Sequence, residues 1–275
     1  MSLLHPQGHT TDVAIRYGTT RWRRRLRIAT RQLELLRPVR LLGPAGIATF
    51  VLAVLALHCL RPDLNPQVHT VSEYSIGDYG WLMRGAFVAL GLGVLATSLS
   101  IDLAFGPSKR RHVGLLLLVG TALGLFLDAG YNTDHLRVPE TTSGAVHGVG
   151  TLMIGLTLPA AALILGSEFT SVSRPGARWL QVLAVAQGGA IFVFETGPIA
   201  YHGLAERICI GMAVAALALM QLFAASASME GDRPRLHFER IERPSPLPAP
   251  EGPSARGGRS SLAPQMATEE ASSDA

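Results

Sequence analysis

Six apolar stretches dominate this chain, and each is about 20 residues long, the length that an α-helix needs to cross a bilayer. Inside a membrane every backbone polar group requires an internal partner, so such stretches become helices. The chain is 48% hydrophobic and 16% charged, which excludes an ordinary soluble domain and a wholly disordered chain. The sequence therefore predicts an all-α fold, an integral membrane bundle of six transmembrane helices.

Polar segments and Gly-Pro breaks set the limits of the six spans. The predicted spans are residues 41–60, 81–105, 113–131, 143–166 and 179–194, and a sixth that follows Gly197-Pro198 and ends near residue 225. Residues 41–225 thus form the predicted transmembrane domain.

Both flanking segments are polar. Residues 1–40 form a basic tail in which Trp22, Leu26, Leu33 and Leu36 could line one side of an interfacial helix on an anionic leaflet. The alternative is a solvated tail that only sets orientation. Residues 226–275 are rich in Pro, Ser, Glu and Arg, a composition that predicts a disordered tail.

The basic residues predict the orientation. An even number of spans places both termini on one side, together with the turns after the second and fourth spans. That side carries 20 of the 24 Lys and Arg residues. Basic residues are retained on the cytoplasmic side, so both termini are predicted to be cytoplasmic in the cell membrane. Because these residues flank apolar spans, the net charge of +4 is interpreted as a topology signal, and no nucleic-acid partner is expected.

Eight ionisable residues are expected to gather near the outer face. Ionisable groups at membrane depth usually face a protein interior or a water-filled cavity. Seven of the eight lie within about two turns of the outer ends of their spans, and the eighth lies in an adjoining loop. The predicted cluster consists of Arg84, Asp128, Asp134, His147, Glu195, His202, Glu206 and Arg207. Ser72, Glu73 and Tyr74 lie in another outer loop.

Three interpretations of this cluster remain open. In a structural interpretation, Arg84 and Arg207 neutralise the carboxylates, and the network sets the register of the helices. In a metal-site interpretation, His202 and Glu206 share a helix face and could hold Zn²⁺ together with His147, leaving one position open for water. In a binding or transport interpretation, the two arginines clamp an anionic group while the acids relay protons or hold a cation.

Short motifs on the spans resemble a known family. They are Thr70-x-Ser72-Glu73-Tyr74, Gly80-Trp81-Leu82-Met83, Thr133-Asp134, Gly144-x-x-His147 and Gly203-Leu204-x-Glu206-Arg207. In this order they resemble the prokaryotic membrane family catalogued as domain of unknown function 998, over about residues 41–225. The resemblance implies a six-helix fold and no established activity. A more distant likeness is to the alkaline ceramidases, which hold zinc, but the chain lacks their paired HxxxH motif on the last helix.

The sequence therefore predicts a multi-pass membrane protein with a polar site near its outer face. We expect this site to bind or transport a small polar or lipid-derived ligand. The alternatives are a metal-dependent membrane hydrolase, with Zn²⁺ as its cofactor, and a non-catalytic membrane partner subunit. The lipid bilayer is the expected surrounding partner.

Overall fold

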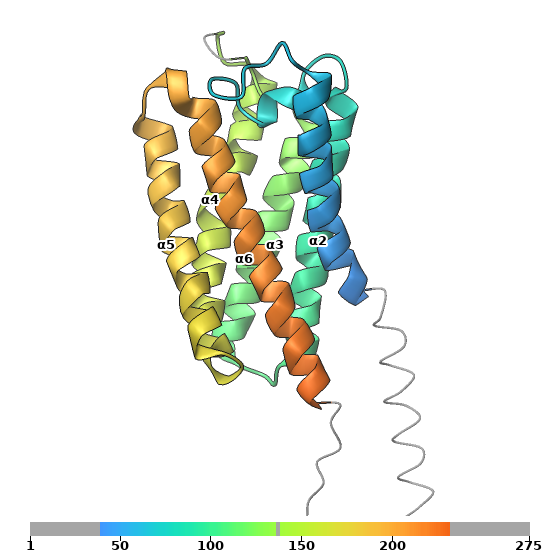
Figure 1. Ribbon diagram of the computed structural model, residues 1–275, viewed down its shortest axis with the longest axis vertical. Helices are drawn as coiled ribbons and strands as arrows, with labels where there is room; N and C mark the ends of the chain where they lie inside the picture. The colour runs from blue at the N-terminus through green and yellow to red at the C-terminus, as the bar shows by residue number, and fades with distance from the viewer. Residues whose placement is uncertain (1–38, 136–137, 232–275) are drawn as a thin grey trace, which may run out of the picture. The chain divides into compact units, whose positions relative to one another are not determined.

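The computed structural model describes residues 39–135 and 138–231. This part of the chain contains six helices that are long and apolar enough to cross a membrane, and it contains no strand. Successive helices run in opposite directions through one bundle (Figure 1). The predicted all-α fold with six membrane-spanning helices is confirmed, and the protein is a multi-pass membrane protein.

The helix boundaries agree with the predicted spans to within a few residues at most ends. The first helix covers Val39–Leu60 and is followed by α2 (Gly80–Ala104), α3 (Lys109–Gly130), α4 (Thr142–Glu168), α5 (Arg174–Thr196) and α6 (His202–Gly231). Three short 3-10 helices lie between them, η1 (Ser72–Ser75), η2 (Phe169–Ser171) and η3 (Ile199–Tyr201). Helix α6 continues beyond the predicted end of the sixth span at residue 225. The proposed interfacial helix near residues 21–36 lies outside the described residues.

Three of these helices begin with a side-chain cap. Ser108, Thr141 and Ser173 each accept a hydrogen bond from the backbone N–H three residues ahead, at the starts of α3, α4 and α5. Such a cap satisfies one of the first amides of a helix, which has no partner inside the helix. Pro175 stands in the first turn of α5, where its missing N–H breaks no helical bond.

Helices α3 and α4 pack closely through glycine. A Cβ atom on Gly124 would lie 2.6 Å from the carbonyl oxygen of Gly150, and one on Gly150 would lie 2.8 Å from that of Gly124. Further along the same contact, the hydroxyls of Thr121 and Thr157 are 2.8 Å apart and share a hydrogen bond. Small residues and interhelical hydroxyl bonds hold membrane helices together because lipid tails provide no hydrophobic driving force between helices.

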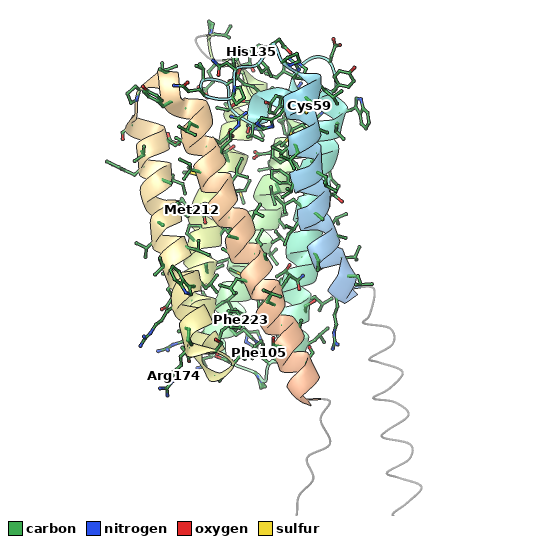
Figure 2. All side chains as sticks on the ribbon, in the orientation of Figure 1. Cys59, Phe105, His135, Arg174, Met212 and Phe223 are labelled. Atoms are coloured by element: carbon green, nitrogen blue, oxygen red, sulfur yellow. The ribbon has the colours of Figure 1, made fainter. Side chains whose placement is uncertain are left out.

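The two ends of the bundle are closed in different ways. The loop end, where α2 and α4 begin, is covered by residues 61–79 and the loop between α3 and α4, which includes His135. At the opposite end, here called the tail end, the Phe169 ring lies 5.3 Å from Phe105 and 4.7 Å from Phe223 (Figure 2). The first helix begins and α6 ends at the tail end (Figure 1). The ionisable groups discussed below lie toward the loop end.

Candidate binding site at the loop end

A cavity of about 320 Å³ lies among the helices and reaches the loop end. All six helices contribute to its wall, and most of the lining side chains are apolar, as Phe87, Leu158 and Leu217 illustrate. The polar side chains that line it toward the loop end are Thr70, Ser72, Asp128, Thr133, His147, Thr151, Glu195 and Glu206. Gln187 also lines the cavity, and like Thr151 it lies roughly 13 Å from the loop-end terminus of its helix at the usual helical rise. The cavity is therefore polar at one end and mostly apolar below it.

Asp128 of α3 and His147 of α4 meet in the wall of this cavity, where they are only 2% and 3% exposed. The Nδ1 of His147 donates to the carbonyl oxygen of Tyr131 at 2.9 Å, and it lies 3.7 Å from the Oδ1 of Asp128. The Oδ2 of Asp128 accepts from the hydroxyl of Thr151 at 3.3 Å. The Asp128 Oδ1 and His147 Nε2 atoms are buried and have no hydrogen-bond partner among the described residues.

A third buried atom without a partner lies further down the cavity. Gln187 of α5 is 3% exposed, and its Oε1 has no hydrogen-bond partner among the described residues. A carboxylate oxygen, an amide oxygen and the second nitrogen of a neutral imidazole whose first nitrogen donates are all acceptors. A buried acceptor without a partner is destabilising by about 1–3 kcal/mol. Three residues of the cavity lining therefore each carry a polar atom that has no hydrogen-bond partner among the described residues.

Glu206 connects α6 to the loop above the cavity. Its Oε2 accepts from the backbone N–H of Val71, and its Oε1 accepts from the hydroxyl of Ser72 at 3.1 Å. Both of these loop residues are buried. Since Glu206 also lines the cavity, it adds a carboxylate to the polar end while holding the first residues of η1 in place.

Arg207, the next residue, does not line the cavity but fastens the same loop. Its Nη1 donates to the carbonyl oxygens of Pro66 and His69, at 2.8 and 2.7 Å. Its Nη2 donates to the Tyr74 hydroxyl at 3.2 Å, and its Nε donates to the Nε2 of His58 at 3.0 Å. A planar guanidinium with five N–H groups can make all these bonds at once.

Two other predicted residues also lie away from the cavity lining. Arg84 of α2 has an exposed side chain. His202 donates from its Nε2 to the carbonyl oxygen of Gly197 at 3.2 Å, which links the start of α6 to the end of α5. Arg84 and Arg207 therefore do not share a ligand pocket, and the anion clamp suggested by the sequence has no support in this geometry.

Asp134 stabilises the start of α4. Its carboxylate accepts from the backbone N–H of Thr141 at 2.7 Å and from the Thr141 hydroxyl at 2.8 Å. These two hydrogen bonds lower the pKa of Asp134 below its usual value, because they favour the charged form.

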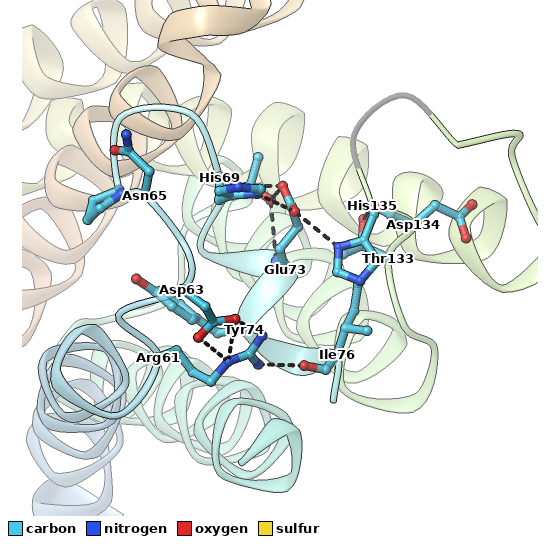
Figure 3. A network of polar contacts seen from close by, with 12 residues as sticks. Arg61, Asp63, Asn65, His69, Glu73, Tyr74, Ile76, Thr133, Asp134 and His135 are labelled. Atoms are coloured by element: carbon cyan, nitrogen blue, oxygen red, sulfur yellow. Dashed lines mark hydrogen bonds and ion pairs between the residues drawn. The ribbon is translucent and has the colours of Figure 1, made fainter. Parts of the chain in front are cut away.

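Glu73 joins the two loops that cover the cavity (Figure 3). The carboxylate is 1% exposed, and its Oε2 accepts from the Nδ1 of His69 at 2.8 Å and from the Nδ1 of His135 at 3.3 Å. Its Oε1 accepts from the backbone N–H of Thr70 at 3.1 Å. Thr70 and Thr133, which lie close to these histidines in the sequence, line the cavity. The contact between Glu73 and His135 thus ties together the two segments above the polar end.

Arg61 holds the first of these loops in shape. Its Nε and Nη2 donate to the carboxylate of Asp63 at 2.9 and 2.8 Å, and its Nη1 donates to the carbonyl oxygen of Ile76 at 2.7 Å (Figure 3). The hydrogen bond with Asp63 raises the pKa of Arg61, and the same bond lowers the pKa of Asp63. The beginning and the end of the loop are therefore joined by one side chain.

Among residues 39–135 and 138–231, no group of three or more His, Cys, Asp or Glu side chains is arranged to hold a metal ion. His147 and Glu206 line the cavity, whereas His202 does not. The three residues suggested for Zn²⁺ thus lie in different surroundings.

Several lining residues were not identified from the sequence. Gln187 is a polar amide within an apolar span, and Thr151 follows His147 by one helical turn. Both could therefore have been identified from the sequence. Thr70 and Thr133 lie in loops that only the fold brings to the cavity.

Comparison with known proteins gives one match. A family model described as "Protein of unknown function (DUF998)" matches residues 44–222, which is more than half of the chain and most of the helical bundle. The match confirms the resemblance found in the motifs. No curated protein and no solved structure matches the chain.

Proposed function

The chain belongs to the DUF998 family, and from the geometry of its cavity we propose that it binds an amphiphilic, lipid-derived ligand within the membrane. The polar head of the ligand lies near Asp128, His147 and Glu206, and its apolar part occupies the deeper cavity. The family description names no activity, so the proposal rests on the site itself.

The chemistry of the lining selects the head group. Asp128, Glu195 and Glu206 line the cavity, and no Lys or Arg among the described residues does so. The buried atoms without partners that belong to lining residues are Asp128 Oδ1, His147 Nε2 and Gln187 Oε1, and each can accept a hydrogen bond. A head group that carries hydrogen-bond donors or a positive charge complements this lining, whereas a carboxylate or phosphate adds repulsion. The ligand class is therefore a long-chain amine, amino alcohol or alcohol.

The shape of the cavity supports a ligand with an apolar part. A volume of about 320 Å³ lies within the range of small-molecule sites. Phe87, Leu158 and Leu217 in its wall offer no hydrogen-bond donor or acceptor in their side chains, so an alkyl chain fits them better than a sugar or a free amino acid does. Transport of the ligand stays a prediction.

The proposed orientation places this site near the outer leaflet. The beginnings of α3 and α5, at the tail end, contain Lys109, Arg110, Arg111, Arg174 and Arg178. By the positive-inside rule we infer that the tail end faces the cytoplasm, and that the loop end with its polar lining lies on the outer side.

Native mass spectrometry of the purified, delipidated full-length protein tests the proposal. Dodecylamine, dodecanol and dodecanoate are added separately, and the bound fraction is measured. We expect dodecylamine to bind at least tenfold more tightly than dodecanoate, with dodecanol between them. The Asp128→Asn variant removes the carboxyl group that pairs with the ammonium and should weaken amine binding about tenfold, or roughly 1.4 kcal/mol.

The control is Arg84→Gln, which changes an exposed side chain outside the cavity and should leave binding unchanged. Equal binding of dodecylamine and dodecanoate to the wild-type protein contradicts the proposed head-group chemistry. So does an Asp128→Asn variant that binds dodecylamine as the wild type does.

A further inference from the structure

Part of the cavity wall is exposed on the side of the bundle. Leu152 and Leu156 of α4 are 56% and 60% exposed, and both line the cavity. Gly148, one turn before Leu152, and Glu195 of α5 are also exposed residues of the lining. A residue that borders both the cavity and the surroundings stands at an opening. The cavity therefore opens sideways between α4 and α5.

This opening lies at the depth of the lipid tails. Gly148, Leu152 and Leu156 are roughly 9, 15 and 21 Å from the start of α4 at the usual helical rise. The hydrocarbon core of a bilayer is about 30 Å thick, so these residues face acyl chains and not bulk water. The opening is hereafter called the α4–α5 portal. Gly148, Leu152 and Leu156 border it at this depth, and Glu195, one residue before the end of α5, borders it at the loop end.

We propose that the α4–α5 portal is the route by which an amphiphile passes from the bilayer into the cavity. This inference rests on the proposed function and adds the source of the ligand, which is the membrane and not the aqueous phase. The ligand class narrows accordingly to lipids and other amphiphiles that partition into the bilayer.

The alternative route, through the loop end, is covered by bonded residues. Glu73 joins the loop of residues 61–79 to the loop that contains His135, and Arg207 and Glu206 bind the first of these loops to α6. Opening that end breaks hydrogen bonds to charged groups, which are stronger than hydrogen bonds between neutral groups.

The portal opens without such losses. A Cβ atom on Gly148 would meet no atom within 4 Å, so the backbone there leaves free space. The exposed leucines already contact lipid tails, which replace protein contacts at almost no free-energy difference because both are apolar. Movement of two leucine side chains is therefore the easier way to admit an alkyl chain.

The free space at Gly148 provides a sharp test. The Gly148→Phe variant adds a large ring to a residue of the portal, and no neighbour of the Cβ has to move. Gly85→Phe is the matched control. Gly85 is also an exposed helical glycine whose added Cβ would meet no atom within 4 Å, but it does not line the cavity.

The experiment uses photolabelling of the full-length protein in lipid nanodiscs. One probe is dodecylamine with a diazirine near the end of its chain, and the other is a dodecane with the same diazirine and no head group. After short, timed exposures, labelled peptides are mapped by mass spectrometry. Leu158 and Leu217, which are 1% and 2% exposed, report on the cavity interior. Val88 and Leu116, which are 41% and 70% exposed, report on the lipid-facing surface.

We expect the rate of interior labelling to fall at least tenfold in Gly148→Phe, while Gly85→Phe and the lipid-facing positions keep wild-type rates. Interior labelling of Gly148→Phe at the wild-type rate overturns the portal, as does the absence of interior labelling in the wild type. The two proposals fail separately. Suppose that both probes label the interior at equal rates and to equal extents, and that Gly148→Phe slows both. The proposed head-group chemistry is then wrong, and the portal stands.

Discussion

At the scale of single residues, charged side chains at the loop end bind backbone groups of irregular segments. Arg207 donates to two loop carbonyls, Glu206 accepts the N–H of Val71, and Asp134 accepts the N–H of Thr141. Segments outside helices lack internal partners for these groups, so side chains have to supply them. Under the proposed function, the polar atoms of the cavity lining that have no partner bind the head group of the ligand instead.

The contribution of the Asp134 charge to stability can be measured by varying the pH. A carboxylate whose pKa is lowered by folding stabilises the folded state above its unfolded pKa of about 3.9, and this stabilisation is lost as the pH falls through the folded value. The Asp134→Asn variant should therefore unfold at a lower temperature than the wild type at pH 7. The difference should shrink steadily below about pH 4. Thermal unfolding in detergent, followed by circular dichroism between pH 7 and pH 3, measures it.

Glu140→Gln is the control for this series because Glu140 is an exposed carboxylate of the same loop. It should leave the unfolding temperature close to that of the wild type at every pH. A deficit of Asp134→Asn that stays constant from pH 7 to pH 3 would show that the charge of Asp134 does not stabilise the start of α4.

At the scale of the helices, the contact between α3 and α4 positions the polar end of the cavity. Asp128 and His147 lie on these two helices, and Gly124 and Gly150 set how closely the helices approach. A side chain on either glycine meets backbone of the other helix, which cannot move aside as a flexible side chain can. The separation of the two ionisable groups therefore depends on residues that carry no charge.

The Gly150→Ala variant tests this dependence. Its methyl group would lie 2.8 Å from the carbonyl oxygen of Gly124 and close to the carboxylate of Asp128, so α4 has to shift. Overpacking of this kind lowers the free energy of unfolding by about 1–3 kcal/mol. Denaturation of the purified protein in mixed micelles measures the loss. Gly148→Ala, where the methyl group meets nothing within 4 Å, should show no loss. Equal stabilities of the two variants would contradict the close contact.

At the scale of the whole molecule, the orientation in the membrane decides which leaflet the cavity serves. The bundle carries the basic beginnings of α3 and α5 at the tail end and its polar cavity lining toward the loop end. If the tail end is cytoplasmic, as the positive-inside rule predicts, the portal takes its ligand from the outer half of the bilayer.

Cysteine labelling of intact cells tests this orientation. In a background in which Cys59 and Cys209 are serine, single cysteines replace Asp78 at the loop end and Gly106 at the tail end, both of which are exposed. A membrane-impermeant maleimide should label Asp78→Cys in intact cells and Gly106→Cys only after permeabilisation. The reverse pattern would place the loop end in the cytoplasm.

The sequence determined the six helices, their approximate ends and the depth of the ionisable groups. These are properties of position along the chain, because the thickness of the bilayer sets the length of a span and helical rise converts residue number into depth. Asp128, His147, Glu195 and Glu206 were expected near one end of the bundle, and all four line the cavity there.

Only the tertiary structure decided which way each side chain faces. Arg84 and His147 were both placed within about two turns of the outer ends of their spans, yet Arg84 is exposed and His147 is only 3% exposed in the cavity wall. The sequence of a span that is apolar on nearly every side does not show which side packs against a neighbouring helix. Lipid and protein interior are equally apolar, so both select the same residue types. The rotation of each helix, and with it the membership of the site, follows from close contacts such as that between Gly124 and Gly150.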